Sequence, residues 1–300
     1  MIMRGGFFMI LKQFLLVLWL TPGIGKERAN RAIHAIEKCY APTQYPWEFE
    51  DLCHIIELTK QTSVTKLAGF KNGYLTALNQ AQQFKDPYLS YFDDAYPERL
   101  RQIYQPPLIL FYQGHLDALK LPSLSVVGTR SASPYSLNVL RTFLPKVVNT
   151  GVAIVSGLAK GVDVMAHQIT FSQQGVPIAV IGTGINVAYP ANHHSLQKQI
   201  GQQGLLLSEY PPNTSPRRAH FPDRNRIIAG LSSATLVIEA KRHSGSLITA
   251  NSALQNNRQV LAIPGSIFST ESQGTNELIK AGALPVTKLS DIMEVVTPLI

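Results

Sequence analysis

Residues 124–130, LSVVGTR, show the repeating unit of this fold. It holds a short apolar run, Leu124–Val127, followed by Gly128, Thr129 and Arg130. A continuous apolar run of this length is typical of a strand that is buried on both faces of a sheet. A glycine directly after the run predicts a tight turn into the next element. The stretch therefore indicates a buried strand followed by a turn that opens a helix.

The same unit recurs along the chain. The other predicted strands are Leu108–Tyr112, Ala153–Val155, Ile178–Ile181, Leu205–Leu207, Ala234–Ile238 and Val260–Ile263. The predicted helices are Ser136–Val148, Val162–Gln174, His193–Gln202, Arg226–Leu231 and Ser246–Asn257, and Leu278–Val286 closes the domain. This alternation of strands and helices predicts an α/β fold with a mostly parallel sheet.

Small residues follow most of the predicted strands. In an open parallel sheet such turns lie along one edge, beyond the carboxyl ends of the strands, where ligands bind. Each turn also opens a helix whose free N–H groups favour an anion. The candidate anion-binding residues are Gly128, Thr129, Arg130, Ser156, Gly157, Lys160, Gly182, Gly184, Ser244, Gly245 and Ser246. Because no turn has the spacing GxGxxG or GxxxxGK[ST], we expect no nicotinamide cofactor and no P-loop nucleotide.

A basic cluster, RRAHFPDRNRIIAG, occupies residues 217–230. Its candidate binding residues are Arg217, Arg218, Phe221, Arg224, Asn225 and Arg226. Arginines bind phosphates and an aromatic ring stacks on a base, so the cluster predicts a groove for a single-stranded nucleic acid. The alternatives are a solvated basic loop and a Phe221 that packs in the core. We expect one of Arg224 and Arg226 to be structural, because a helix begins here.

The composition agrees with a polyanion as partner. The chain has 300 residues, of which 45% are hydrophobic, and its 27 Lys and Arg against 19 Asp and Glu give a formal charge of +8. A basic balance of this kind attracts nucleic acid or an anionic surface. Cys39 and Cys53 form no CxxC pair, so we expect both to be small hydrophobic residues in helices, in a reducing, cytoplasmic compartment.

The N-terminal part is predicted to be helical. The apolar run at residues 7–20 lacks a cleavage site and is too short to span a bilayer, so it predicts a buried helix and no membrane segment. Gly23, Ile24 and Gly25 then predict a turn into a second helix. The turn is either a plain connection in a helical bundle or a helix-hairpin-helix turn that holds a DNA phosphate. Val64–Leu78 predicts a weaker second copy of it.

The predicted organisation has four parts. They are a helical domain at 1–84, a connector at 85–107, an α/β domain at 108–288 and a short tail at 289–300.

Catalytic groups are sparse. Asp163 and His167 are four residues apart on one predicted helical face, and we expect a surface or capping pair. Glu209 and Glu239 lie at strand ends and are candidate bases, without a partner that the sequence identifies. The consecutive histidines 193–194 point in different directions and have no third ligand, so we expect no metal site.

Taken together, these segments resemble one family. SVVGTRSAS at 125–133, IVSGLAKGVDVMAH at 154–167, AVIGTGINVAYPANH at 179–193, the stretch from LLLSEY to SLITA at 205–250 and PGSIFSTESQGTNELIKAGA at 264–283 are similar to the DNA-processing protein A family, also called DprA or Smf. The resemblance is dense over residues 108–286 and looser in the N-terminal helical domain.

The resemblance implies an extended Rossmann-like domain after a small SAM-like helical domain. It implies a non-enzymatic protein that binds incoming single-stranded DNA during natural transformation, protects it and helps to load the RecA recombinase, as a homodimer. It implies DNA contacts from Gly128 and Arg130, and from Arg218 three residues before a stacking Phe221. Some members have lysine where this chain has Arg218. Many members also carry a C-terminal winged helix, for which we expect no room before Ile300.

The alternative hypothesis is an enzyme that hydrolyses the N-glycosidic bond of nucleotide monophosphates on a related Rossmann-like fold. Pro264-Gly265 and Gly274–Glu277 faintly echo the phosphate turn and the glutamate of such enzymes, although Ser266–Gln273 interrupts them. The enzyme hypothesis predicts nucleobase release that requires Glu277. The binding hypothesis predicts no turnover, and binding of oligonucleotides but not of mononucleotides.

Overall fold

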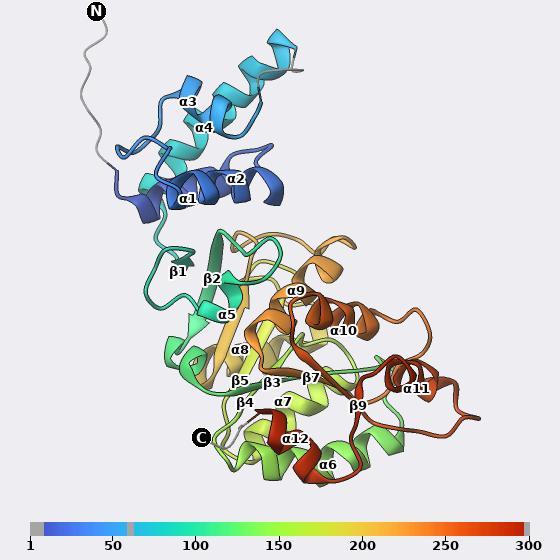
Figure 1. Cartoon of the computed structure of the whole chain (residues 1–300). Helices are drawn as coiled ribbons and strands as arrows, with labels where there is room; N and C mark the ends of the chain where they lie inside the picture. Colours follow the sequence, from blue (N-terminus) through green and yellow to red (C-terminus); the bar gives the residue numbers. More distant parts are fainter. Residues whose placement is uncertain (1–8, 59–62, 297–300) are drawn as a thin grey trace, which may run out of the picture. The chain divides into compact units, whose positions relative to one another are not determined.

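The computed structural model describes residues 9–58 and 63–296 (Figure 1). The chain divides into two compact units. The first comprises Met1–Tyr96 and Gln105–Leu110, and the second comprises Pro97–Tyr104 and Phe111–Ile300. Residues 97–104, which we expected in a connector, therefore belong to the second unit, where the short helix α5 (Glu98–Arg101) packs against α9 (His220–Leu231).

Over residues 9–58 and 63–96, the first unit has four helices. These are α1 (Leu11–Leu20), α2 (Lys26–Glu37), α3 (Phe49–Ile55) and α4 (Val64–Gln83), followed by the short strand β1 (Tyr88–Ser90). The predicted buried helix is α1, in which Phe14–Leu18 are fully buried; Phe7 and Phe8 lie outside the described residues. The predicted turn into α2 is also present. Whether that turn contacts DNA stays a prediction.

The predicted second helix-turn copy at Val64–Leu78 is wrong, because these residues belong to the single helix α4. Its buried residues are Phe70, Tyr74, Ala77 and Ala81, a 3–4 spacing that keeps one face against the rest of the unit. Gly73 lies inside this helix, and a Cβ added there would be 3.1 Å from Cδ of Pro22. The glycine thus allows the α1–α2 turn to pack closely on α4 and does not end the helix.

The prediction for the cysteines is half wrong. Cys53 is buried in α3, as expected. Cys39 is exposed in the turn after α2, with a backbone φ of 56°, so it is not a packed helical residue. Within the described part of the chain, every helix is too short or too polar to cross a membrane.

The sheet is mostly parallel, which confirms the predicted fold class. Beyond β1, its strands are β2 (Ile109–Gly114), β3 (Ser123–Val127), β4 (Ala153–Ser156), β5 (Pro177–Ile181), β6 (Leu205–Ser208), β7 (Ala234–Val237), β8 (Gln259–Ala262) and β9 (Leu284–Pro285). Their order is β1-β2-β6-β5-β4-β3-β7-β8-β9. Strands β3 to β9 run parallel to one another, and β2 pairs antiparallel with β6. The sequence pattern missed β1, which has only three residues.

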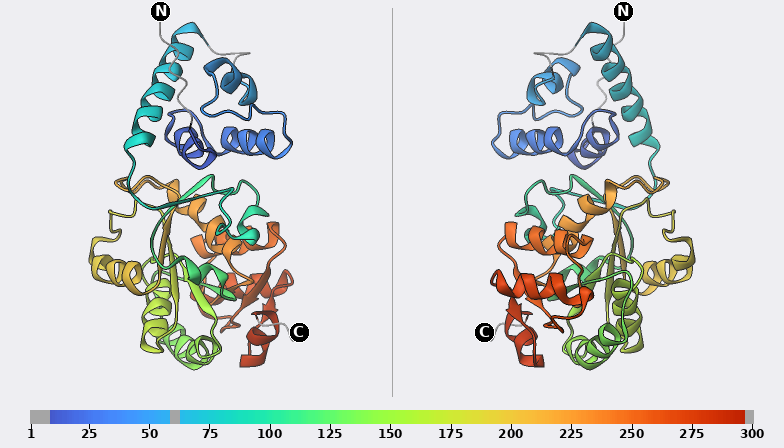
Figure 2. Two further views of the ribbon diagram at one scale, coloured as in Figure 1. Left: turned by 90° about the vertical axis from the view of Figure 1, so that its left-hand side faces the viewer. Right: turned by 90° about the vertical axis from the view of Figure 1, so that its right-hand side faces the viewer.

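Helices cover both faces of this sheet. They are α6 (Pro134–Val148), α7 (Val162–Ser172), α8 (His194–Gln203), α9, α10 (Gly245–Gln255), α11 (Gln273–Lys280) and α12 (Leu289–Val296), with 3-10 turns at Leu116–Lys120, Ala191–His193 and Thr270–Ser272. In Figure 2 the green and yellow helices α6 to α8 lie on one side of the strands, and the orange helices α9 and α10 lie on the other. The side chains of β3 alternate accordingly, because Leu124 and Val126 enter the core beside α6 and α7 whereas Ser125 Oγ donates to Ile228 O of α9.

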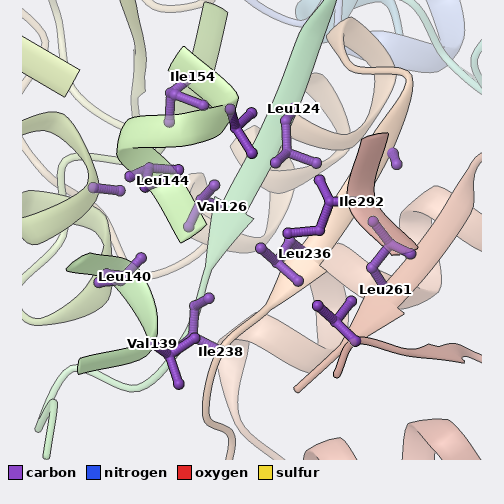
Figure 3. Close-up of a cluster of buried hydrophobic side chains, with 14 of the residues drawn as sticks. Leu124, Val126, Val139, Leu140, Leu144, Ile154, Leu236, Ile238, Leu261 and Ile292 are labelled. Atoms are coloured by element: carbon purple, nitrogen blue, oxygen red, sulfur yellow. The ribbon is translucent and has the colours of Figure 1, made fainter. Parts of the chain in front are cut away.

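The main core lies between β3, β4, β7, β8 and the helices α6, α7 and α12 (Figure 3). Figure 3 shows Leu140 and Leu144 of α6 and Ile292 of α12 beside Leu124 and Leu236 of the central strands. The expected short tail therefore contains a helix that belongs to the core. Burial of apolar area at about 25 cal/mol per Å² is the main term that holds these layers together.

Helix α9 begins six residues earlier than predicted, at His220 and not at Arg226. Pro222 lies in its first turn, where a missing N–H costs nothing because no intrahelical partner exists there. The longer helix makes Phe221 and Arg224 neighbours on one helical face, three residues apart.

The strand order also fixes where a ligand would bind. From β3 the chain winds outward through β4, β5 and β6, and it then returns to the other side of β3 to form β7. The carboxyl ends of β3 and β7 are therefore a topological switch point, the place at which open α/β sheets bind ligands.

Candidate nucleic-acid interface

The turns after β3, β4 and β7 meet at this switch point. The amide of Val162, at the start of α7, donates to the carbonyl of Thr129 at 3.2 Å. The amide of Thr129 in turn donates to the carbonyl of Glu239 at 2.8 Å. These backbone bonds hold the turn that carries Arg130 against the turn that carries Lys160.

Arg224 joins α9 to the carboxyl ends of β4 and β5. Its side chain is buried, and one terminal nitrogen donates to the carbonyl of Gly157 at 2.6 Å and to the carbonyl of Val180. Its Nε donates to the side-chain oxygen of Asn225 at 3.1 Å. This guanidinium therefore holds the scaffold together and is not available to a phosphate, which corrects the prediction of a direct contact.

The charged guanidinium of Arg224 is buried in the protein interior, away from water. Burial lowers the pKa of its guanidinium to about 10, and the carboxylate of Asp163 opposes part of that shift. Burial likewise raises the pKa of Asp163, against the opposing effect of Arg224. The two buried groups therefore offset each other's loss of hydration.

The glycines that we predicted as open phosphate cradles are filled by the protein itself. A Cβ added at Gly157 would lie 2.6 Å from a terminal nitrogen of Arg224, and one at Gly182 would lie 3.0 Å from the ring of Phe221. A Cβ at Gly184 would clash with the carbonyl oxygens of residues 211–212. These glycines allow close packing of the protein on itself, and whether they also contact a phosphate stays a prediction.

The turn after β3 is similarly packed at its base. A Cβ at Gly128 would lie 2.6 Å from Val162. Thr129 is 8% exposed, and its Oγ1 accepts the amide of Ser131 at 3.2 Å. Ser156 is fully buried and donates to the carbonyl of Val126 at 2.6 Å. Of the candidates in these turns, these three are structural.

Two internal carboxylates occupy positions where a bound anion would otherwise sit. Asp163 accepts the amides of Gly157 and Ala159 at 3.0 and 3.3 Å, at the entrance to α7. Glu239 is 3% exposed and accepts the hydroxyl of Ser133 at 2.7 Å and also that of Ser136, at the start of α6. Neither carboxylate is a free catalytic base, and both neutralise the N-terminal ends of helices that a mononucleotide phosphate would need.

The other members of the arginine cluster separate into paired and exposed groups. Arg226 forms an ion pair with the buried Glu209 at 2.5 Å, with only 11% of its own side chain exposed. The amide of Asn225 donates to the carbonyl of Gly245 at 3.2 Å and so ties α9 to the start of α10. Arg224 and Arg226 are thus both structural, where we expected only one of them to be.

Four cations remain on the surface of this edge. They are Arg130, Lys160, Arg217 and Arg218, and all four are exposed. Within the described residues none of them forms an ion pair, in contrast to Arg226 beside them. Exposed cations without carboxylate partners are the arrangement that suits a polyanion, because no internal pair has to break.

An aromatic group lies beside these cations. The ring of Phe221 is half-buried against Gly182, and the ring of Tyr189 lies 5.3 Å from it at 38°. Tyr189 is 47% exposed. The ring of Tyr210 stacks on that of His220 at 3.8 Å. The sequence did not predict Tyr189 as part of this edge, because no local pattern places it beside the ring of Phe221, which is 32 positions away.

The turn after β7 keeps an open helix end. Ser244 precedes α10 without capping it by its side chain, and its hydroxyl contacts that of Ser246 at 2.9 Å. A Cβ at Gly245 would meet nothing within 4 Å. This is the one predicted glycine turn of the edge that the structure leaves open.

The remaining catalytic candidates do not form a reaction centre. Asp163 is the expected capping residue, but His167 is fully buried, so the pair does not lie on the surface. Glu277 forms an exposed ion pair with Arg242 at 2.5 Å, and a Cβ at Gly265 would clash with Ser272. Across residues 9–58 and 63–296, no three His, Cys, Asp or Glu side chains are grouped so that they could hold a metal ion.

The fold and this edge define a Rossmann-like protein with a surface of free cations and aromatic rings at the carboxyl ends of its strands. The chain belongs to the DNA recombination-mediator protein A family, whose model matches residues 87–297. It is 47% identical over 209 residues to the DNA processing protein DprA of Streptococcus pneumoniae, which covers 70% of this chain and 74% of that one. The family that the sequence resembled is thereby confirmed.

The solved structures that are similar to this chain include two of DNA processing protein A. The X-ray structure of DNA processing protein A from Streptococcus pneumoniae matches with a TM-score of 0.85 and 37% identity, over 95% of this chain and 98% of that one. The DNA processing protein A of Helicobacter pylori, whose structure describes a single-stranded DNA binding mode, matches with a TM-score of 0.63 and 29% identity. The match covers 70% of this chain and 95% of that protein.

The two classes of arginine are expected to differ in their effect on stability. Arg224→Ala leaves the carbonyls of Gly157 and Val180 without their donor and should lower the free energy of unfolding by roughly 2–4 kcal/mol. Arg218→Ala removes an exposed side chain and should change it by less than about 0.5 kcal/mol. Urea unfolding measures both values, and equal effects would contradict the division into structural and exposed arginines.

His167 should make stability depend on pH. Burial, with a smaller effect of Arg224, lowers its pKa from 6.5 to about 3. The folded state thus binds fewer protons than the unfolded state between these values, so stability is complete above pH 6.5 and falls as the pH drops toward 3.

Between about pH 7.5 and about pH 5.5, the free energy of unfolding should therefore fall by about 1.4 kcal/mol more in wild type than in His167→Leu. Urea unfolding at the two pH values gives this difference. Burial raises the pKa of Asp163, so this residue contributes stability at low pH that is lost as the pH rises. Because Asp163 is present in both proteins, its contribution cancels in the difference between them. The same pH dependence in both proteins would show that His167 does not resist protonation.

Proposed function

We propose that this chain binds single-stranded DNA across the carboxyl edge of its parallel sheet. The observation that carries the proposal is the set of four exposed, unpaired cations, Arg130, Lys160, Arg217 and Arg218, on the edge that also holds the half-buried ring of Phe221. Cations that follow a phosphate backbone, together with a ring on which a base stacks, are the two parts of a single-strand site. The single-stranded DNA binding mode of the Helicobacter pylori relative supports the same ligand class.

The form of the site favours a polymer over a mononucleotide. Asp163 and Glu239 already occupy the inner anion positions at the starts of α7 and α6. A single phosphate would have to displace a buried carboxylate, whereas a strand that lies on the surface meets only the free cations. Duplex DNA should bind less well, because its bases are not available to stack.

The open start of α10 extends the proposed path toward β7. Gly245 has free space around it, and the helix lacks a side-chain cap. Its free amides would take one more phosphate of the same strand. Stacking tolerates all four bases, so we expect no base-specific readout along this path.

The name of the matching family, DNA recombination-mediator protein A, supports a cellular role in recombination. We propose that this chain, as a cytoplasmic homodimer, protects incoming single-stranded DNA during natural transformation and helps to load the RecA recombinase. The proposed role needs binding and no chemical step.

Two substitutions test the binding site separately. Phe221→Ala should weaken binding of an oligothymidylate of about 20 nucleotides by about ten-fold at an unchanged salt dependence, because stacking carries no charge. Arg130→Ala should weaken binding and reduce the slope of log K against log salt by about 0.7, the value for one phosphate of a single strand. Fluorescence anisotropy over a salt series measures both quantities.

Arg141→Ala is the matched control, because Arg141 is exposed on α6 and not on this edge. It should bind with wild-type affinity and slope. Wild-type binding by both Phe221→Ala and Arg130→Ala would contradict the proposed site. Nucleobase release from a mononucleotide, lost in Glu277→Gln, would instead support the enzyme hypothesis.

A further inference from the structure

The loop after β8 presents two apolar side chains to solvent. Ile267 is 80% exposed and Phe268 is 92% exposed. Single exposed apolar residues are common on protein surfaces, so exposure alone decides nothing. The way in which this loop is held is more informative.

The base of the loop is fixed at two points. The amide of Gly265 donates to the side-chain oxygen of Asn276 at 3.2 Å, and the side-chain nitrogen of Asn276 donates to the carbonyl of Gly265 at 3.0 Å. The hydroxyl of Tyr135, at the start of α6, donates to the carbonyl of Pro264 at 2.6 Å. The loop is thus anchored both to α11 and to the element that follows the turn of Arg130.

The tip of the loop is itself a closed turn. The amide of Ser269 donates to the carbonyl of Ser266 at 3.0 Å, and the amide of Phe268 donates to the hydroxyl of Ser266 at 3.2 Å. The ring of Phe268 is therefore presented from an ordered backbone. A backbone that is ordered before binding loses little conformational entropy when a planar group stacks on the ring.

The charges that pack with this segment are already paired. Lys241 forms an ion pair with Glu271 at 2.9 Å, and Arg242 pairs with Glu277 at 2.5 Å. The tip therefore offers apolar, aromatic surface without free positive charge, unlike the edge around Arg130. A ligand that this tip recognises would be bound through its flat faces and not through its phosphates.

The strand order places this tip on the same edge as Phe221. Phe221 packs at the end of β5, and the loop of Phe268 follows β8, with β4, β3 and β7 between them. Four strand spacings amount to roughly 19 Å. Tyr135, which is 43% exposed, lies at the base of the loop between the two positions.

We propose that Phe268 is a second stacking position for the bases of the same single strand, several nucleotides away from Phe221. This inference rests on the proposed function. It extends that function because it gives the single-stranded DNA a path along the sheet edge between β5 and β8. The occupant is a nucleobase, since the tip follows a strand of the sheet edge that carries the free cations and itself has no cation. Phe268 supplies stacking and the cations supply the phosphate contacts.

The test uses the full chain and an oligothymidylate of about 20 nucleotides. Phe268→Ala should weaken binding about five-fold or more at an unchanged salt slope, and Phe268→Trp should restore it. Ile267→Ala is the matched control, because it removes an equally exposed apolar side chain from the same tip, and it should bind like wild type. Since Phe268 is almost fully exposed, none of these substitutions should change the unfolding temperature.

A second measurement separates this inference from the proposed function. An oligonucleotide that carries 5-iodouracil at every position is irradiated on the wild-type chain, and the cross-linked residues are identified by mass spectrometry. Cross-links at both Phe221 and Phe268 support the inference. Cross-links at Phe221 without Phe268, or wild-type binding by Phe268→Ala, would overturn it and leave the proposed function standing.

Two further outcomes are decisive. If the wild-type chain does not bind the oligonucleotide at all, the proposed function is contradicted, and the inference that rests on it is contradicted as well. If Phe268→Ala instead changes the sedimentation of the free chain, the tip is an interface between copies of this chain and the stacking position is refuted.

Discussion

The site depends on one buried guanidinium. Arg224 reaches from α9 to the carbonyls of Gly157 and Val180, and so it connects the helix to the ends of β4 and β5. Its charge is tolerated because Asp163 lies close enough to oppose the shift in its pKa. By fixing the first turns of α9, this contact sets the positions of Phe221 and of the arginines that precede the helix. The exposed part of the site thus depends on a residue that does not itself reach the surface.

Internal contacts of this kind also explain why the carboxyl edge of the sheet is an exposed surface and not an enclosed pocket. A Rossmann-like sheet normally offers the starts of its helices to a phosphate at the switch point. Here Asp163 accepts an amide of the loop before α7, Glu239 accepts the hydroxyl of Ser133 at the start of α6, and the protein packs closely on Gly157 and Gly182. The remaining free charge lies on the exposed residues of the turns. A flexible polyanion that follows the edge can use such charges, whereas a small anion finds no enclosed site.

Most of the α/β layer could be predicted from the sequence, because its strands are apolar runs that end in turn residues. β1 could not be predicted in this way, since Tyr88–Ser90 is too short to show a pattern. The turn expected within Val64–Leu78 and the start expected for α9 at Arg226 were wrong, because the helices accommodate Gly73 in the interior of α4 and Pro222 in the first turn of α9. The glycine turns were located correctly, but the side chains that pack above Gly157 and Gly182 were not predicted. What fills the space above Gly157 is Arg224, a contact between residues 67 positions apart, and no local pattern reveals it.

Hydrogen–deuterium exchange of the full chain, with and without an oligothymidylate of about 20 nucleotides, distinguishes a DNA site on the sheet edge from one on the helical unit. We predict slower exchange in three segments that are separate in the sequence, 128–131, 159–161 and 216–222, because the strand covers the exposed turns of this edge. Protection confined to the α1–α2 turn at residues 21–25, with these three segments unchanged, would contradict this prediction. In that case the DNA site would belong to the helical unit and not to the sheet.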